Sequence, residues 1–249
     1  MRATLAMFAA AVAVVSAVAA VARADSPAWN AEADALNLQR DDAAAAARYE
    51  ALLQAKLKED PKSYDALYRL AALHLWKGDG LPEGREKADA GKECWQIAER
   101  ALAVEPKGAQ ALYNKAACVG SYSEAVGVAH ALWEGLEGKF RGALDPVVAG
   151  DKKLEHCGPL NLLGRYYFDL PWPKHDGKRS MEVLDDALKT CPEDLRAAFY
   201  LAETTADEGQ KDRAKKLLDQ VDAGSDAYDP PEARRVKALA KTLRSKLKL

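Results

Sequence analysis

Apolar residues recur every three to four positions along this chain, in runs that stop at a proline or a glycine. In residues 195–221, one such run is followed by a turn at Gly209 and then by a second run. The two runs carry small and apolar side chains on one helical face each: Ala198, Leu201, Ala202 and Thr205, then Ala214, Leu218 and Val221. Two amphipathic runs around a glycine are typical of antiparallel helices that pack together, so this segment is predicted to be a helical hairpin.

The same helix ending is repeated along the chain. Ala101-Leu102 precedes Pro106 at the same spacing with which Ala187-Leu188 precedes Pro192. Because proline lacks the backbone N–H and clashes with the preceding turn, each of these helices must end before it. With a weaker copy at Pro146, the helix-ending prolines 61, 106, 146 and 192 are separated by 45, 40 and 46 residues. This near-regular spacing indicates an array of helical hairpins.

The repeat length and the residue pattern favour different repeat families. Repeats of roughly 40 to 47 residues are typical of HEAT and armadillo units, whereas the small and apolar pattern before Gly78 and around Gly209 favours the tetratricopeptide repeat of about 34 residues. An insertion after Gly78 accounts for part of the extra length. The sequence therefore predicts an all-α protein, a right-handed solenoid of antiparallel, tetratricopeptide-like helix hairpins over residues 48–228.

The two ends of the chain differ from the repeats. Residues 25–47, in which Asp41-Asp42 is followed by five alanines, are predicted to be a polar linker that enters the first helix. Asp229-Pro230-Pro231 starts a last helix, residues 229–249, which has one apolar stripe and a strongly basic remaining surface. We expect this helix to cap the array, because a terminal repeat needs a polar outer face. Contact with anionic lipid or with a protein partner is the alternative.

Residues 1–24 have the pattern of an export signal. Arg2 is followed by an almost wholly apolar stretch over residues 5–21, and Ala22-Arg23-Ala24 is a small-x-small cleavage pattern. A transmembrane anchor is the alternative, but the apolar run of about 17 residues is shorter than the roughly 20 that a spanning helix needs. No cysteine lies near the cleavage point. The chain cut after Ala24 is therefore expected to be a soluble periplasmic or secreted protein without a transmembrane segment.

The predicted export favours disulfide bonds between the four cysteines, because disulfides form in oxidising compartments. Two residues of an antiparallel hairpin face each other when they are equally far from its turn. Cys94 and Cys118 are centred on Pro106, and Cys157 and Cys191 are centred in the loop expected between two helices. We therefore predict the disulfides Cys94–Cys118 and Cys157–Cys191, with four reduced core cysteines as the alternative. A structural zinc site, which usually has cysteines roughly two to four residues apart, does not fit this spacing.

Charge and motifs argue against nucleic-acid binding and against catalysis. The formal net charge is −2, and it becomes −4 without the leader, which carries two arginines and no acidic residue. A protein that binds the phosphate backbone needs a basic excess instead. No glycine-rich phosphate loop, Gly-x-Ser-x-Gly elbow or His-Glu-x-x-His motif is present, and no metal or cofactor is predicted. A hydrolase that uses His156 or His175 with Asp176 is the remaining enzymatic hypothesis.

Residues 157–221 carry the most distinctive local sequence. Gly164-Arg165-Tyr166-Tyr167 is followed by Leu170-Pro171-Trp172-Pro173 and then by the Ala-Leu-x-x-x-Pro ending at Pro192. In this order the block resembles the TatT-like family, the periplasmic tetratricopeptide component associated with TRAP-type transport. The resemblance implies an all-helical protein with a groove or channel for small apolar or amphipathic ligands. Members of that family are often lipid-anchored, whereas this leader lacks the required cysteine.

A groove in such a stack is expected to be lined by the first helices of the hairpins, whose inner faces form the concave wall. The candidates for this lining are Tyr113, Trp133, Arg165, Tyr166 and Trp172. Arg165 is expected either to clamp a ligand carboxylate or to pair with Asp169 one turn later. Trp172 is expected either to line the groove or to plug the end of its hairpin.

These observations predict a non-catalytic periplasmic binding or scaffold protein. One hypothesis is the capture of a small apolar or amphipathic ligand for a TRAP-type transport system. The alternative is a scaffold for protein–protein interaction in cell-envelope assembly. The expected partners are accordingly subunits of a transporter or of the envelope, or a small apolar ligand, and no nucleic acid.

Overall fold

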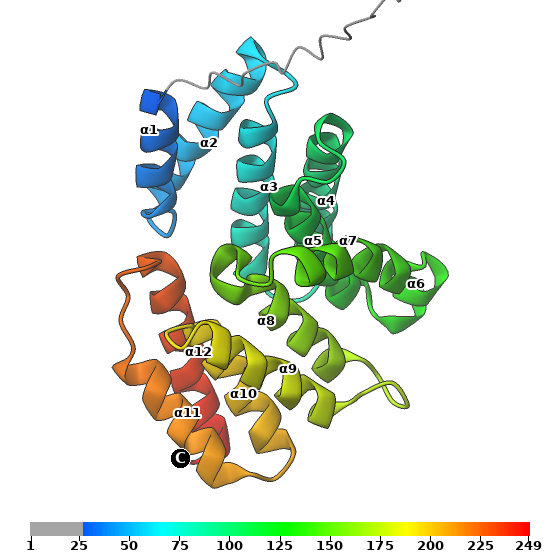
Figure 1. Ribbon diagram of the computed structural model, residues 1–249, viewed down its shortest axis with the longest axis vertical. Helices are drawn as coiled ribbons and strands as arrows, with labels where there is room; N and C mark the ends of the chain where they lie inside the picture. Colours follow the sequence, from blue (N-terminus) through cyan, green and yellow to red (C-terminus); the bar gives the residue numbers. More distant parts are fainter. Residues whose placement is uncertain (1–26) are drawn as a thin grey trace, which may run out of the picture.

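The computed structural model describes residues 27–249, and the expected export signal at residues 1–24 lies outside this range. The described residues form twelve helices and no strand, so the all-α prediction is confirmed. The helices are α1 (Pro27–Asn37), α2 (Ala43–Glu59), α3 (Tyr64–Asp79), α4 (Arg85–Val104), α5 (Ala109–Val126), α6 (Val128–Trp133), α7 (Leu136–Gly150), α8 (Leu154–Asp169), α9 (Gly177–Thr190), α10 (Leu195–Asp207), α11 (Lys211–Ala223) and α12 (Pro230–Leu247) (Figure 1). None of these helices combines the length and the apolar composition that a membrane crossing requires.

The contacts between the helices arrange them in two rows. The inner helices, α3, α5, α8, α10 and α12, each pack on the next member of their own row. The outer helices, α2, α4, α7, α9 and α11, pack beside them, and α4, for example, contacts both α3 and α5. This is the hairpin stacking of a tetratricopeptide-like solenoid, and α12 caps its end by packing on α10 and α11.

Helix ends follow the polar side chains and the prolines of the sequence. Ser63 precedes α3 and Asp194 precedes α10, and each side chain accepts a backbone N–H from the first turn of its helix. Pro61, Pro106 and Pro192 follow the ends of α2, α4 and α9, as predicted. The register of the hairpins is therefore set by local features of the sequence.

Pro146 does not end a helix, contrary to the prediction from its spacing. It lies inside α7, which continues to Gly150. Leu144 and Val147, on either side of the proline, are both buried. The helix continues because the burial of these side chains outweighs the hydrogen bond that the proline cannot make.

The segment predicted to be a polar linker, residues 25–47, is largely helical where it is described. It contains the whole of α1 and the start of α2. Trp29, Ala33 and Leu36 share one face of α1 and pack against the apolar core of α2 and α3. Three apolar side chains in an otherwise polar stretch make a weak helical pattern, so this short helix depends on tertiary contacts that the sequence pattern does not reveal.

Both predicted disulfides are present. Cys94–Cys118 joins α4 to α5 with 5.6 Å between the Cα atoms, and Cys157–Cys191 joins α8 to the end of α9 with 6.2 Å. Both distances lie in the usual range for a disulfide. The first bridge links two successive hairpins, whereas the second closes a single hairpin.

The array curves until its first inner helix meets its last ones. Asp79, at the end of α3, accepts a hydrogen bond from Arg235 in α12 at 3.0 Å and pairs with Arg196 in α10 at 3.6 Å. Arg40, in the turn after α1, pairs with Asp229 at the start of α12 at 2.6 Å. The apolar cores of the two ends remain separate clusters. The inner helices therefore surround a concave surface whose ends are joined by ion pairs.

Candidate functional site

The candidate functional site is the concave surface of the inner helices, on which arginine and aromatic side chains alternate. The guanidinium carbon of Arg165, in α8, lies 5.0 Å from the ring centroid of Phe168 and 5.2 Å from that of Tyr200 in α10. Arg196, also in α10, lies 5.4 Å from the same Tyr200 ring. Cation–π contacts therefore connect two successive inner helices on this surface.

The arginines of the concave surface are also paired with carboxylates. Arg165 contacts Asp169 at 2.6 Å and makes a further ion pair with Glu203, while Arg196 contacts Glu232 at 2.6 Å. Burial raises the pKa of Asp169 to about 6, and the positive charge of Arg165 partly opposes this increase. Arg165 thus has one of its two expected roles, the pairing with Asp169, and the second carboxylate that it holds belongs to the protein itself.

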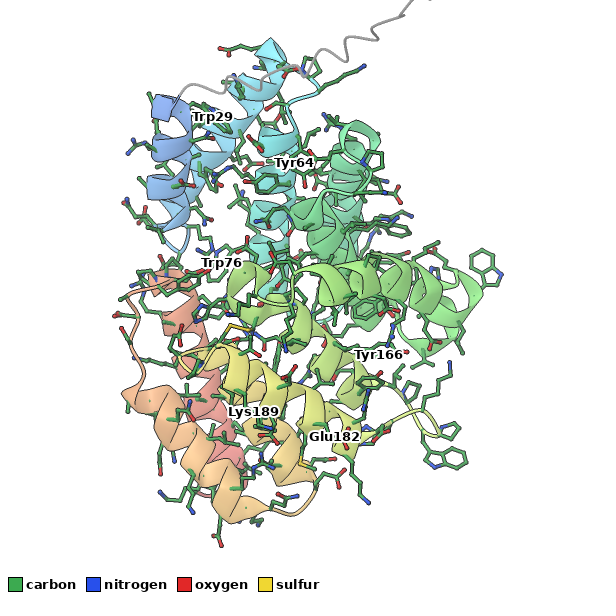
Figure 2. The ribbon with its side chains drawn as sticks, in the orientation of Figure 1. Trp29, Tyr64, Trp76, Tyr166, Glu182 and Lys189 are labelled. Carbon is green, nitrogen blue, oxygen red and sulfur yellow. A yellow bond between two sulfur atoms is a disulfide. The ribbon has the colours of Figure 1, made fainter. Side chains whose placement is uncertain are left out.

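Tyr113 and Tyr166, both predicted to line the groove, lie in different places. The hydroxyl of Tyr113, in α5, is so close to Gly158 that a Cβ atom there would be 2.6 Å from it, and burial raises the pKa of this tyrosine. Tyr166 lies between α7 and α8 (Figure 2), where its ring stacks on Phe140 at 5.1 Å and its hydroxyl donates to Glu137 at 2.8 Å. Tyr113 therefore joins α5 to the beginning of α8, whereas Tyr166 joins α7 and α8.

The two predicted tryptophans both have exposed side chains, and their place in a groove stays a prediction. Trp133 lies in α6 and is 82% exposed, and Trp172 lies in the loop between α8 and α9 and is 89% exposed. No residue of α6 is buried, because this short helix is an insertion between α5 and α7 that packs little of its own surface. Trp172 does not plug its hairpin either, since nearly the whole side chain faces solvent.

The residues of the hydrolase hypothesis each have another structural partner. Asp176 caps α9 by accepting a backbone N–H at 2.9 Å, and His175 Nδ1 lies 2.7 Å from the carbonyl oxygen of Phe168. His156 stacks on Tyr228 with 4.0 Å between the ring centroids. This arrangement gives no support to a hydrolytic site.

Trp76 lies where the two ends of the concave surface meet (Figure 2). The guanidinium carbon of Arg235 is 3.1 Å from its ring centroid and that of Arg40 is 4.3 Å from it. Arg234, also in α12, donates two hydrogen bonds to Asp41, at 2.6 and 3.0 Å. The basic residues at the start of α12, which could have contacted lipid or a partner, are therefore engaged within the chain.

Sequence reasoning missed a left-handed turn at the beginning of α8. Glu155, His156 and Cys157 have φ angles of 45°, 57° and 64°, a left-handed conformation that residues other than glycine rarely adopt. Burial raises the pKa of the Glu155 carboxyl group, and a hydrogen bond from Gln110 partly opposes this increase. Neither glycine nor asparagine marks these three positions, so the sequence contains no signal for the turn.

Comparison with protein families and with curated proteins gives no match, and the resemblance to the TatT-like family gains no support from it. Among solved structures, PilF of Pseudomonas aeruginosa matches with a TM-score of 0.52 and 16% identity, over 88% of this chain and 93% of PilF. MamA matches with a TM-score of 0.45 and 14% identity, over 73% of this chain and 90% of MamA. At this identity the similarity to PilF shows the fold alone, which is tetratricopeptide-like.

Proposed function

We propose that this protein is a scaffold whose concave surface binds an extended segment of a protein partner. The observation that carries the proposal is the alternation of Arg165, Tyr200 and Arg196 from successive inner helices on one concave surface. Helical solenoids use surfaces of this shape to bind extended ligands. Arginine and tyrosine are also among the side chains that contribute most to protein interfaces. The tetratricopeptide-like fold supports the same function.

An extended segment suits this surface better than a small apolar ligand does. Small-molecule sites are enclosed cavities with mostly apolar walls. The concave surface instead presents ion pairs and tyrosine hydroxyls, and the depression beside Trp76 is polar and open to solvent. Capture of a small apolar ligand for transport therefore rests on the resemblance to the TatT-like family alone.

The disulfides suggest where the partner is found. Two disulfides within one chain of this size are typical of proteins that fold in an oxidising compartment. Together with the expected export signal, they favour a role in the assembly of the cell envelope. The partner is then expected to be another envelope protein.

Site-specific photo-crosslinking in the cells that make this protein tests the proposal. Benzoylphenylalanine replaces Tyr200 on the concave surface, and the matched control carries it at Lys189, an exposed position on the outer helix α9 (Figure 2). We expect a protein adduct at position 200 that is absent at position 189, and circular dichroism verifies that both variants fold. Digestion of the adduct should give one short peptide of the partner.

Two results would contradict this function. Adducts that form at position 189 and not at position 200 would place the interface on the outer helices. A small apolar molecule that co-purifies with the chain, in the absence of any protein adduct at position 200, would favour the transport hypothesis instead.

A further inference from the structure

The first end of the array, α1 to α3, meets the last end, α10 to α12, at a seam of charged side chains. The ion pairs that cross the seam are Arg40–Asp229 and Arg234–Asp41, each at 2.6 Å, Arg235–Asp79 at 3.0 Å and Arg196–Asp79 at 3.6 Å. We call the residues of these pairs the clasp. Each end carries charges of both signs, and each charge of the clasp faces its opposite across the seam.

A tryptophan lies within the seam. The ring of Trp76, in α3, is held between two guanidinium groups, that of Arg235 at 3.1 Å from the ring centroid and that of Arg40 at 4.3 Å (Figure 2). Arg235 also donates a hydrogen bond to the Trp76 carbonyl oxygen at 3.0 Å. Because Arg40 comes from the first end and Arg235 from the last, the surroundings of Trp76 depend on whether the two ends are in contact.

The two ends have separate apolar cores. Among the described residues, the buried apolar side chains of α1 to α5 form one cluster and those of α9 to α12 form another, and the two clusters share no member. The side chains of Asp79 and Arg234 in the clasp are 43% and 54% exposed, so water and salt reach them. Ion pairs of this kind are weak and are screened by salt. Separation of the ends leaves both cores intact and therefore costs far less than unfolding.

Arg196 links the clasp to the concave surface. This arginine pairs with Asp79 across the seam, and it also pairs with Glu232 at 2.6 Å and makes a cation–π contact with Tyr200. A ligand that binds at Tyr200 and engages the Arg196 guanidinium competes with Asp79 for it. By linkage, whatever separates the ends then favours this ligand, and the ligand favours separated ends to the same degree.

We propose that the clasp is an electrostatic closure that opens to admit the bound segment to the concave surface. In the closed form the first and last ends are in contact. In the open form they separate, and each end keeps its own apolar core. The control of access rests on the proposed function, whereas the opening itself does not.

Ion pairs that serve only to fix the curvature of the array lead to a different expectation. The two ends would then keep one separation at every salt concentration. Reversal of a charge in the clasp would change the stability of the protein but not the distance between its ends.

A distance measurement between the two ends tests the opening with the full chain. Spin labels are attached to a ketone-bearing amino acid at Glu32 and Lys241, exposed positions on α1 and α12, so that the native disulfides stay untouched. Pulsed electron–electron double resonance then gives the distribution of distances. We expect one short distance at about 0.01 M sodium chloride and a second, longer one that grows towards about 1 M, because the screening length falls from about 30 to about 3 Å.

Reversal of one charge tests whether attraction across the seam holds the ends together. Asp41→Arg places a like charge opposite Arg234 and beside Arg40, and it should raise the fraction of open molecules about tenfold at low salt. Exchange of the pair, Asp41→Arg with Arg234→Asp, should return this fraction close to the wild-type value. The matched control, Asp186→Arg, reverses a charge of the exposed pair Lys152–Asp186 outside the seam and should leave the distance unchanged.

Photo-crosslinking from position 200 tests the control of access. We expect Asp41→Arg to increase the yield of the protein adduct, and the exchanged pair to restore the wild-type yield. A single separation of the ends in Asp41→Arg and at high salt would overturn the inference, whatever adducts form. Ends that separate while a measurable adduct yield stays the same would overturn it as well. Separation of the ends without an adduct in any variant would support the opening of the clasp and contradict the proposed function.

Discussion

Replacement of Glu155 by glycine is expected to stabilise the protein. At φ 45° and ψ 47°, Glu155 occupies the left-handed region, where a residue with a Cβ atom costs about 1–2 kcal/mol that glycine does not. Glycine in turn loses more backbone entropy on folding, about 0.5–1 kcal/mol. The net expectation is a gain of roughly 0.5–1 kcal/mol in the free energy of unfolding.

The charge of Glu155 makes a separate contribution that Glu155→Gln isolates. Glutamine keeps the left-handed backbone but cannot ionise. Because burial raises the pKa of Glu155 above its ordinary value of 4.5, the folded protein binds this proton more tightly than the unfolded chain does. The contribution of Glu155 to stability is therefore greatest below 4.5 and is lost as the pH rises through the higher folded-state pKa. The advantage of Glu155→Gln over the wild type should accordingly be small at acidic pH and larger at neutral pH.

Urea unfolding followed by circular dichroism, with the disulfides intact, measures both effects. His156→Gly is the informative control, since it relieves a similar φ of 57° but removes the stacking on Tyr228. We expect Glu155→Gly to be more stable than the wild type and also more stable than His156→Gly. If Glu155→Gly is less stable than the wild type at neutral pH, the strain assigned to the left-handed turn is not there.

Three further predictions concern the rest of the fold. Replacing Cys94 and Cys118 together by alanine should lower the free energy of unfolding by about 3.5 kcal/mol, and replacing Cys157 and Cys191 together by about 3.8 kcal/mol, because the bridges span 24 and 34 residues. A loss of about 1 kcal/mol or less from either pair in urea titrations would contradict the loop-closure argument. Gly164→Ala should destabilise the protein by about 1–3 kcal/mol, because the new Cβ atom would lie 2.5 Å from the Leu184 Cγ atom. An unchanged melting temperature in thermal melts would mean that α8 and α9 can move apart. Trp133→Ser and Trp172→Ser should each change stability by less than about 0.5 kcal/mol, and a larger loss would show that these exposed rings have contacts in the folded chain.

The parts of the fold that could be predicted depend on interactions between near neighbours in the sequence. Pro106 and Pro192 end helices because each acts on the turn directly before it. Cys94 could be paired with Cys118 because two antiparallel helices joined by a turn place equidistant residues opposite each other. Pro146 was misjudged because the burial of side chains around it, a tertiary property, decides whether its helix continues.

By itself the sequence determined that this chain is an array of helical hairpins, where most of its helices end and which cysteines pair, because helical periodicity and turn residues act locally. Only the tertiary structure decided which side chains share the concave surface. It left the Trp133 side chain exposed, and it placed Trp76 between two arginines and Tyr228 against His156. The reason is that the curvature of the array arises from packing between successive hairpins, and small changes in that packing add up along the chain, so no local pattern reveals which distant residues meet.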